Sequence, residues 1–226
     1  MEAISLKVKQ YPDFFQEYAA THEESYSYNP LEKDLLYLSI QRTMDIVLSL
    51  MGLIISLPII VLFSILIKLE TPGPVFFLQE RVGLNGRYFK VIKLRSMGID
   101  AEKNGAKWAE KNDPRVTKVG YFIRRTRIDE IPQLWNVVVG EMSLVGPRPE
   151  RPMFTAEFNE KIPGFVNRLT VKPGISGWAQ INGGYDISPN EKLKLDLYYI
   201  KNQSFLLDIK ILIGTVKIVL TGNGAR

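Results

Sequence analysis

A cluster of charged side chains just after the middle of the 226-residue sequence could act on a phosphate group. Arg124, Arg125 and Arg127 precede two adjacent carboxylates, Asp129 and Glu130. Neighbouring cations favour the ionised form of a carboxylic acid, so we expect Asp129 to be charged at neutral pH. An ionised carboxylate can attack phosphorus and form a covalent intermediate. The cluster therefore predicts Asp129 as a nucleophile, with Glu130 beside it.

Pro132 restricts where a helix can begin, because proline is tolerated in a first turn but not in a helix interior. We expect a helix over residues 130–139 that ends at Gly140, with Asp129 near its N-cap. Adjacent residues on a helix point about 100° apart, so the two carboxylates should have different tasks. One could attack while the other holds a metal ion. The alternative is that Asp129 only caps the helix.

Two further groups of cations could contact an anionic substrate. Lys93 and Arg95 alternate along a predicted strand over residues 87–97, so their side chains should project from one face. Arg148 lies between two prolines, and an arginine on so stiff a loop suits bidentate recognition of phosphate. The structural alternatives are a solvated strand face and an arginine that anchors its loop.

The composition excludes several kinds of site. The sequence has no cysteine and a single histidine, His22, which excludes thiolate chemistry and metal sites rich in histidine. It has neither a G-x-x-x-x-G-K-[ST] phosphate loop nor a strand-linked G-x-G-x-x-G fingerprint. The net charge of +5 favours anionic partners without choosing among phosphates, acidic lipids and nucleic acid.

One long apolar segment indicates contact with a membrane. The 22 residues 46–67 are all uncharged, and a straight helix of that length spans about 33 Å, enough to cross a bilayer. Pro58 lies in this segment and should kink or break the helix. Two topologies compete. One is a kinked spanning helix, which hydropathy favours, and the other is a re-entrant hairpin that enters and leaves by one face.

The remaining sequence predicts a hairpin and several helices. Residues 75–82 and 87–97 are rich in β-formers and are joined around an Asn-Gly pair at 85–86, a good hairpin signal. Residues 1–40 are polar and aromatic without strong periodicity, and we interpret them as an adaptor segment. Helices are expected near residues 99–111, 189–201 and 205–221. The last of these suits an interfacial membrane helix.

With these motifs in view, the sequence resembles the bacterial sugar transferase family, the monotopic phosphoglycosyl transferases. The resemblance runs from about Gln41 to the C-terminus. It is carried by several long motifs: Arg-Thr-Met-Asp at 42–45, Gln-Glu-Arg-Val-Gly at 79–83, Lys-Leu-Arg-Ser-Met at 93–97, Asp-Glu-Ile-Pro-Gln-Leu-Trp-Asn-Val at 129–137, Gly-Glu-Met-Ser-Leu-Val-Gly-Pro-Arg-Pro at 140–149 and Pro-Gly-Ile-Ser-Gly at 173–177.

The resemblance implies an α+β fold that is mostly helical. The adaptor at 1–40 would precede a membrane helix-break-helix at 41–69. A compact catalytic domain at 70–226 would then contain a small β-hairpin and interfacial amphipathic helices. The membrane helix would be re-entrant, which reverses the preference from hydropathy, with its break near Ser56 and Pro58. It would sit in the bacterial inner membrane with the catalytic domain facing the cytoplasm.

The same resemblance implies a two-step reaction with Mg²⁺. Asp129 would attack the β-phosphate of a UDP-sugar and release UMP. A polyprenyl (undecaprenyl) phosphate would then take the phospho-sugar from the aspartyl intermediate, as a first membrane step in assembling exopolysaccharide, capsule, O-antigen or a glycoprotein glycan. Glu130 would help to hold Mg²⁺. The expected phosphate or substrate contacts are Lys93, Arg95, Arg124 and Arg148.

Two other functions stay open on the sequence alone. A glycosyltransferase that moves sugar without phosphate would release UDP. A basic membrane-binding protein would show no turnover and no need for Asp129. The resemblance implies membrane lipids but no nucleic acid as partners. The identity of the sugar, the pathway and the oligomeric state, with a homodimer among the options, are left open.

Overall fold

The computed structural model describes residues 35–103, 105, 113–183 and 187–221. Helices make up most of this part, with one antiparallel hairpin and one short parallel pair of strands, so the predicted α+β, mostly helical fold is confirmed. The elements, with η for a 3₁₀ helix, are α2 (Leu35–Glu70), β1 (Phe76–Val82), η2 (Leu84–Gly86), β2 (Tyr88–Leu94), α3 (Lys118–Arg125), η3 (Ile128–Glu130), α4 (Gln133–Val139), β3 (Ser143–Val145), α5 (Pro152–Lys161), η4 (Phe165–Thr170), β4 (Gly174–Ser176), α6 (Trp178–Asn182), α7 (Pro189–Lys201) and α8 (Phe205–Thr221).

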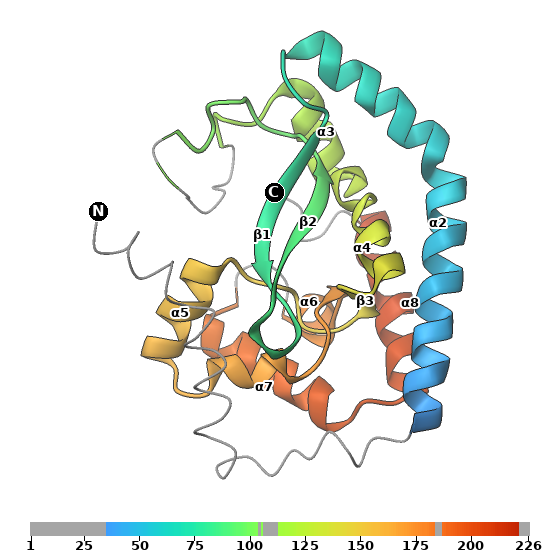
Figure 1. Ribbon diagram of the computed structural model, residues 1–226, viewed down its shortest axis with the longest axis vertical. Helices are drawn as coiled ribbons and strands as arrows, with labels where there is room; N and C mark the ends of the chain where they lie inside the picture. The colour runs from blue at the N-terminus through green and yellow to red at the C-terminus, as the bar shows by residue number, and fades with distance from the viewer. Residues whose placement is uncertain (1–34, 104, 106–112, 184–186, 222–226) are drawn as a thin grey trace.

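Helix α2 lies along one side of the body formed by the other elements, and it bends along its length (Figure 1). It is long and apolar enough to cross a membrane, at 36 residues. The helix is continuous through Pro58, because a proline removes one hydrogen bond and bends a helix without necessarily ending it. The Ser56 hydroxyl donates to the Gly52 carbonyl, one turn back, at 2.6 Å. The expected break of a helix-break-helix is therefore absent, and α2 is one continuous helix that bends along its length (Figure 1).

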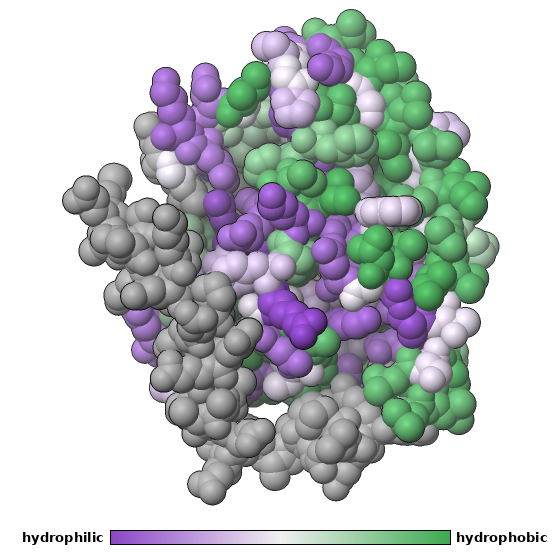
Figure 2. All heavy atoms as spheres, in the orientation of Figure 1, coloured by the Kyte–Doolittle hydropathy of each residue, from purple (hydrophilic) through white to green (hydrophobic). Residues whose placement is uncertain are grey.

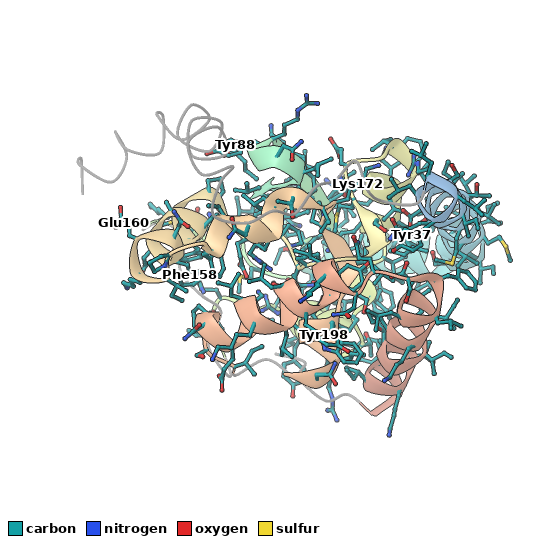
Figure 3. The ribbon with its side chains drawn as sticks, turned by 90° about the horizontal axis from the view of Figure 1, so that it is seen from below. Tyr37, Tyr88, Phe158, Glu160, Lys172 and Tyr198 are labelled. Atoms are coloured by element: carbon teal, nitrogen blue, oxygen red, sulfur yellow. The ribbon has the colours of Figure 1, made fainter. Side chains whose placement is uncertain are left out.

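The first half of α2 is bound to the body by buried polar contacts. Arg42 donates two hydrogen bonds of 2.7 Å to carbonyls in the last turn of α4. The buried Asp45 carboxylate accepts hydrogen bonds from two groups of β3, at 3.0 and 2.9 Å. Tyr37 lies where α2 meets α8 (Figure 3) and donates to Asp208 at 2.9 Å. Because α2 begins at Leu35, the expected boundary at residue 41 falls inside this helix. Residues 1–34 of the predicted adaptor lie outside the described residues.

The far end of α2 is bound to the same body. Ile67 packs with Leu94 of β2 and Ile123 of α3 in a buried cluster. The Glu70 carboxylate accepts hydrogen bonds from the first two N–H groups of α3, at 2.7 and 3.0 Å. It supplements the N-cap Thr117, whose hydroxyl accepts a third such bond. Both ends of α2 therefore contact one domain.

Between its ends, α2 presents bare apolar surface. Figure 2 shows hydrophobic side chains gathered over this helix. Ile54 and Ile55 are each 72% exposed. Helix α8 has the bounds expected from the sequence and also exposes apolar side chains, among them Leu206 and Ile213. Large exposed apolar surfaces mark membrane or protein contacts. The interfacial role of α8 stays a prediction.

The predicted hairpin is confirmed. Strands β1 and β2 pair antiparallel over their full lengths. At the turn Asn85 has φ 52° and Gly86 has φ 76°, a left-handed conformation that these two residue types tolerate best. Strand β2 ends at Leu94, three residues before the expected limit, which matters for Arg95 below.

The main core lies around the short parallel pair β3–β4, which the sequence did not predict. Val145 of β3, Tyr199 of α7 and Ile211 of α8 belong to its buried cluster. Helix α7 has the expected bounds, whereas α3 and α5 were not predicted. The expected helix at 99–111 is wrong for its described part. Residues 99–103 form successive turns closed by i to i+3 hydrogen bonds, and Gly105 has a left-handed φ of 90°.

Candidate active site

The two adjacent carboxylates lie on a 3₁₀ turn between α3 and α4. Asp129 and Glu130 belong to η3, and α4 begins only at Gln133, after Pro132. This corrects the prediction that one helix includes Glu130 and is capped by Asp129. The cause is local. Arg127 adopts the left-handed conformation, φ 60° and ψ 13°, and its carbonyl accepts the Glu130 N–H in a tight turn. The expected helix end is confirmed, since Gly140 has φ 90°.

Three cations surround the Glu130 carboxylate. Lys93 Nζ donates to it at 2.9 Å, Arg148 contacts it through both guanidinium Nη atoms, and Arg127 Nη1 lies 3.8 Å away. Burial alone would raise the pKa of Glu130, but Arg148 and Lys93 hold that pKa well below its usual range. Glu130 is therefore a fixed anion, and it joins β2 to η3 and to the Pro-Arg-Pro loop.

Asp129 has a different environment. Its side chain is buried, and its carboxylate accepts no hydrogen bond from the residues that the structure describes. Burial and repulsion from Glu130 raise the pKa of Asp129 to about 6, against the attraction of Lys93, Arg124 and Arg148. The sequence argument counted only the cations and so missed the upward direction. With a pKa of about 6 the carboxylate is still mainly ionised at neutral pH, and its lone pairs are not used by hydrogen bonds.

The predicted phosphate contacts are placed unequally. Lys93 and Arg148 contact Glu130 and keep 18% and 29% of their side chains exposed, so each retains a surface for a substrate anion. Arg124, in the last turn of α3, is close enough to lower the pKa of Asp129. Neighbouring carboxylates whose pKa values are pushed apart are typical of sites where the two groups have different roles.

Arg95 is placed elsewhere, which corrects its expected alignment with Lys93. Strand β2 ends at Leu94, so the alternation that would align the two side chains stops there. Buried Arg95 donates instead to the carbonyls of Thr71, at 2.9 Å, and Pro72, just after α2. Its guanidinium therefore holds the chain just after the long helix, and its expected contact with phosphate stays a prediction.

Two residues of the site were not assigned from the sequence. Arg127 faces Glu130, and its i, i+3 spacing from that carboxylate was the available signal. Asn136 is buried on α4 and makes three hydrogen bonds. Its Nδ2 donates to the Lys90 carbonyl at 2.8 Å and to Glu141 at 2.7 Å, and its Oδ1 accepts from the Ile92 N–H at 3.1 Å. It therefore fixes the strand that carries Lys93 against the helix that follows Glu130.

The carboxylates of the site bear on the expected metal ion. Within the described ranges, no group of three or more His, Asp and Glu side chains could hold a metal. Asp129 and Glu130 still supply two adjacent hard-oxygen donors, and Mg²⁺ is usually bound by one or two carboxylates together with substrate phosphates. The donor set therefore fits an ion that binds together with a diphosphate.

Asp129, which accepts no hydrogen bond within the described residues, lies among cations, and this arrangement suits a nucleophile with countercharge for phosphate, as a phosphoryl-transfer enzyme needs. The sequence matches the family described as "Bacterial sugar transferase" over residues 36–222, and the chain belongs to that family. It is an enzyme of the phosphoglycosyl transferase class, as the motifs predicted.

Several relatives extend this assignment. Over 147 residues the chain is 61% identical to a Bacillus subtilis (strain 168) protein named "Putative undecaprenyl-phosphate N-acetylgalactosaminyl 1-phosphate transferase", which covers 65% of this chain and 82% of that protein. It is 47% identical over 194 residues to the UDP-N-acetylgalactosamine-undecaprenyl-phosphate N-acetylgalactosaminephosphotransferase of Aeromonas hydrophila, covering 84% of this chain and 46% of that one. It is 41% identical over 197 residues to the exopolysaccharide production protein PSS of Rhizobium leguminosarum bv. phaseoli, covering 83% and 98%.

Proposed function

We propose that this protein transfers a sugar 1-phosphate from a UDP-sugar to undecaprenyl phosphate and releases UMP. The observation that carries the proposal is the buried carboxylate of Asp129, which accepts no hydrogen bond from the described residues and lies among Lys93, Arg124 and Arg148. The names of the Bacillus and Aeromonas relatives, which specify undecaprenyl phosphate and a sugar phosphate, support the substrates.

The reaction follows from these groups in two displacements. An oxygen of Asp129 attacks the β-phosphorus of the UDP-sugar. The bond from that phosphorus to the bridging oxygen breaks, and UMP leaves with the electron pair. The phospho-sugar is then joined to the aspartate as an acyl phosphate. A phosphate oxygen of the polyprenyl phosphate attacks the same phosphorus, and the carboxylate leaves, which yields a polyprenyl diphosphate sugar and regenerates Asp129.

The surrounding cations have distinct parts in this scheme. Lys93 and Arg148 are already aligned by Glu130, so they need little reorganisation to meet the charge that develops on the phosphate oxygens. Arg124 adds positive charge from the end of α3. Mg²⁺, held by Glu130 together with the diphosphate, would neutralise part of the substrate charge. EDTA should therefore stop turnover and added Mg²⁺ should restore it, and full activity in EDTA would remove the metal from the scheme.

The donor sugar is proposed from the relatives. The two relatives at 61% and 47% identity are named for N-acetylgalactosamine, whereas an Escherichia coli relative named for glucose is 43% identical. UDP-N-acetylgalactosamine is therefore the first donor to test, with UDP-glucose as the comparison.

Identifying the nucleotide product tests the reaction class. The full chain in detergent, given undecaprenyl phosphate and UDP-N-acetylgalactosamine, should release UMP; release of UDP would indicate a glycosyltransferase. Without acceptor, donor labelled in the β-phosphate should label the protein, and hydroxylamine should remove the label. Asp129→Asn should lose both signals, whereas the matched change Asp100→Asn on an exposed turn should keep them. Release of UMP by Asp129→Asn would refute the nucleophile. A lack of turnover with both donors would favour a binding protein.

We also propose that α2 enters the cytoplasmic face of the bacterial inner membrane without crossing it. Its first half is bound to α4, β3 and α8, and its last turn is bound to α3, so both ends meet one domain. A helix that crossed a bilayer of about 30 Å would place its ends on opposite sides. The exposed apolar middle of α2 then faces the lipid, and the site on η3 faces the cytoplasm, where nucleotide sugars are made.

A further inference from the structure

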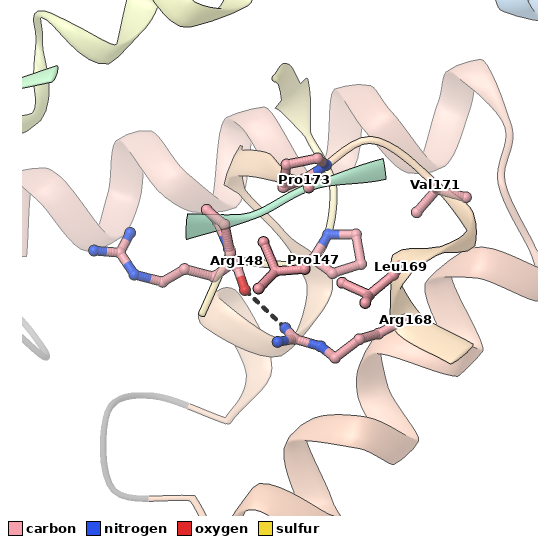
Figure 4. Close-up of a pocket in the computed structure, with 9 residues that line it drawn as sticks. Pro147, Arg148, Arg168, Leu169, Val171 and Pro173 are labelled. Atoms are coloured by element: carbon pink, nitrogen blue, oxygen red, sulfur yellow. Dashed lines mark hydrogen bonds between the residues drawn. The ribbon is translucent and has the colours of Figure 1, made fainter. Parts of the chain in front are cut away.

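A buried network of charged side chains lies behind the loop that carries Arg148. Arg168 of η4 and Asp196 of α7 are 2% and 1% exposed. Arg168 Nε and Nη2 both donate to Asp196 Oδ2, at 3.0 and 2.6 Å. The same Nη2 donates to the backbone carbonyl of Arg148 at 2.8 Å. In Figure 4 that carbonyl points toward Arg168, whereas the guanidinium of Arg148 points away from it.

Glu150 is the second acid of the network. It pairs with Lys192, and it lies 3.8 Å from Arg81 Nη1 and 4.0 Å from Arg168 Nη1. Burial alone would raise the pKa of Glu150, but Lys192, Arg168 and Arg81 lower it to about 2. The Glu150 carboxylate is therefore ionised at any physiological pH.

Two consecutive carbonyls of the loop are held by this network. Arg168 binds the carbonyl of Arg148, and Arg81 binds the carbonyl of Pro149 at 2.9 Å. The ring of Phe165 lies 5.0 Å from the Arg168 guanidinium and packs against it. Arg168 and Arg81 thus hold the backbone of the loop on one side. On the opposite side, the guanidinium of Arg148 reaches Glu130.

Stability does not by itself explain so many buried charges. Desolvating an ion pair costs about as much as its attraction returns, and well-packed apolar side chains often serve a fold as well or better. The accurate placement of a charged group can instead benefit catalysis, because a displacement of about 1 Å can lower the rate about a hundredfold. The network ends on the backbone of the arginine that faces the two carboxylates.

We propose that Arg168 and Asp196 are positioning residues for Arg148. Arg168 holds the Arg148 carbonyl, Asp196 holds Arg168, and the loop therefore presents the Arg148 guanidinium to Glu130 and to the phosphate beside Asp129. This proposal takes one assignment from the proposed function, namely that Arg148 contacts a phosphate of the substrate. Asp196 lies on α7, so this helix influences the geometry of the site through Arg168 and Arg148, although Asp196 is not itself a reacting group.

A double-mutant cycle on UMP release tests the proposal. Arg168→Lys keeps the charge but loses the planar fork, and it should lower kcat about tenfold in otherwise native protein. In an Arg148→Lys background the same change should lower kcat by less than about twofold, because the group being positioned is already altered. Asp196→Asn, which keeps the side-chain volume, should behave in the same way. It supplies the cycle if Arg168→Lys does not yield folded protein.

Arg115→Lys is the matched control. Arg115 pairs with Asp113 at 2.6 Å and donates to the Ala101 carbonyl at 3.2 Å. Any effect of this change should be the same factor in both backgrounds. If Arg168→Lys and Asp196→Asn lowered kcat by the same factor in the native and the Arg148→Lys backgrounds, their role would be merely structural and the proposal would be overturned. A kcat that is unchanged by these substitutions in both backgrounds would also overturn it. If Arg148→Lys itself leaves kcat and KM unchanged, the assignment of Arg148 to phosphate fails instead, and the two failures are distinguishable.

Discussion

At the scale of single residues, the site depends on two neighbouring carboxylates that their surroundings make unequal. Glu130 receives direct contacts from Lys93 and Arg148, which keep it ionised. Asp129 is buried and is repelled by the charge of Glu130, and together these two effects raise its pKa to about 6. Glu130 is thus fixed by hydrogen bonds, whereas Asp129 accepts none from the described residues and is the carboxylate that we propose as the nucleophile.

The buried charge of Asp129 should cost stability. Its pKa of about 6 in the folded protein exceeds the value of about 3.9 for an exposed aspartate. Ionisation therefore opposes folding above about pH 6, and the penalty disappears as the pH falls toward about 4. Asp129→Asn should raise Tm by a few degrees at pH 8 and by much less at pH 4. Thermal unfolding in EDTA across this range checks the prediction, and a Tm gain independent of pH would contradict it.

The left-handed backbone of Arg127 gives a second prediction at this scale. Its φ of 60° is unfavourable for a residue with a Cβ atom and suits glycine. The free energy of unfolding of Arg127→Gly should therefore exceed that of Arg127→Ala by about 1 kcal/mol. In denaturant unfolding, the glycine variant should have the higher midpoint. Both variants remove the cation 3.8 Å from Glu130, so they should lose equal activity. Equal stability of the two variants would show that the turn relaxes when the guanidinium is lost.

At the scale of elements, the site is assembled where β2, η3, α4 and the Pro-Arg-Pro loop meet. Asn136 crosses from α4 to the backbone of β2 with two hydrogen bonds and reaches Glu141 with a third. Arg42 of α2 holds the next two carbonyls of α4, those of Val137 and Val138. A short helix that is bound at both positions can set the distance between Lys93 and Glu130 reproducibly.

Asn136→Ala should therefore destabilise the protein and misplace the site. Its loss leaves buried donors and acceptors without partners, which we expect to cost about 2–4 kcal/mol. Activity per folded molecule should also fall, because β2 and α4 are no longer linked. Denaturant unfolding and UMP release check both effects. Asn202→Ala is the control. Asn202 is exposed and bonds one carbonyl of α7, so it should cost under about 1 kcal/mol.

At the scale of the whole molecule, α2 is part of the domain's framework, and in the proposed topology it is also the surface that faces the membrane. Its two ends are bound to one body, its middle exposes apolar side chains such as Ile54 and Ile55 on one face, and it bends along its length (Figure 1). In the proposed topology this helix would hold the candidate site at a constant distance from the membrane surface.

Cysteine labelling tests this topology, since the sequence contains no cysteine. Ser5→Cys reports on the segment before α2, and Asn190→Cys reports on the exposed first turn of α7. In intact cells both thiols should resist a membrane-impermeant maleimide, and both should react after lysis. Labelling of Ser5→Cys in intact cells while Asn190→Cys stays protected would show that α2 crosses the membrane.

The sequence by itself determined the features that depend on local order along the chain. The apolar run of α2, the hairpin turn at Asn85 and the bounds of α7 and α8 each follow from a periodicity or a turn signal within a few residues. The adjacency of Asp129 and Glu130 and the rigidity around Arg148 are likewise local, so the central part of the site could be named from the sequence.

Only the tertiary structure decided which cations reach those carboxylates. Lys93 is 37 positions from Glu130 in the chain and bonds to it, whereas Arg95, two residues further on, turns to the end of α2 because β2 has ended. The sequence likewise did not predict that the pKa of Asp129 is raised, or that Asp196 contacts Arg168 and Arg168 contacts Arg148. Burial and electrostatic energy depend on distances in space, and sequence spacing does not supply those distances between separate elements.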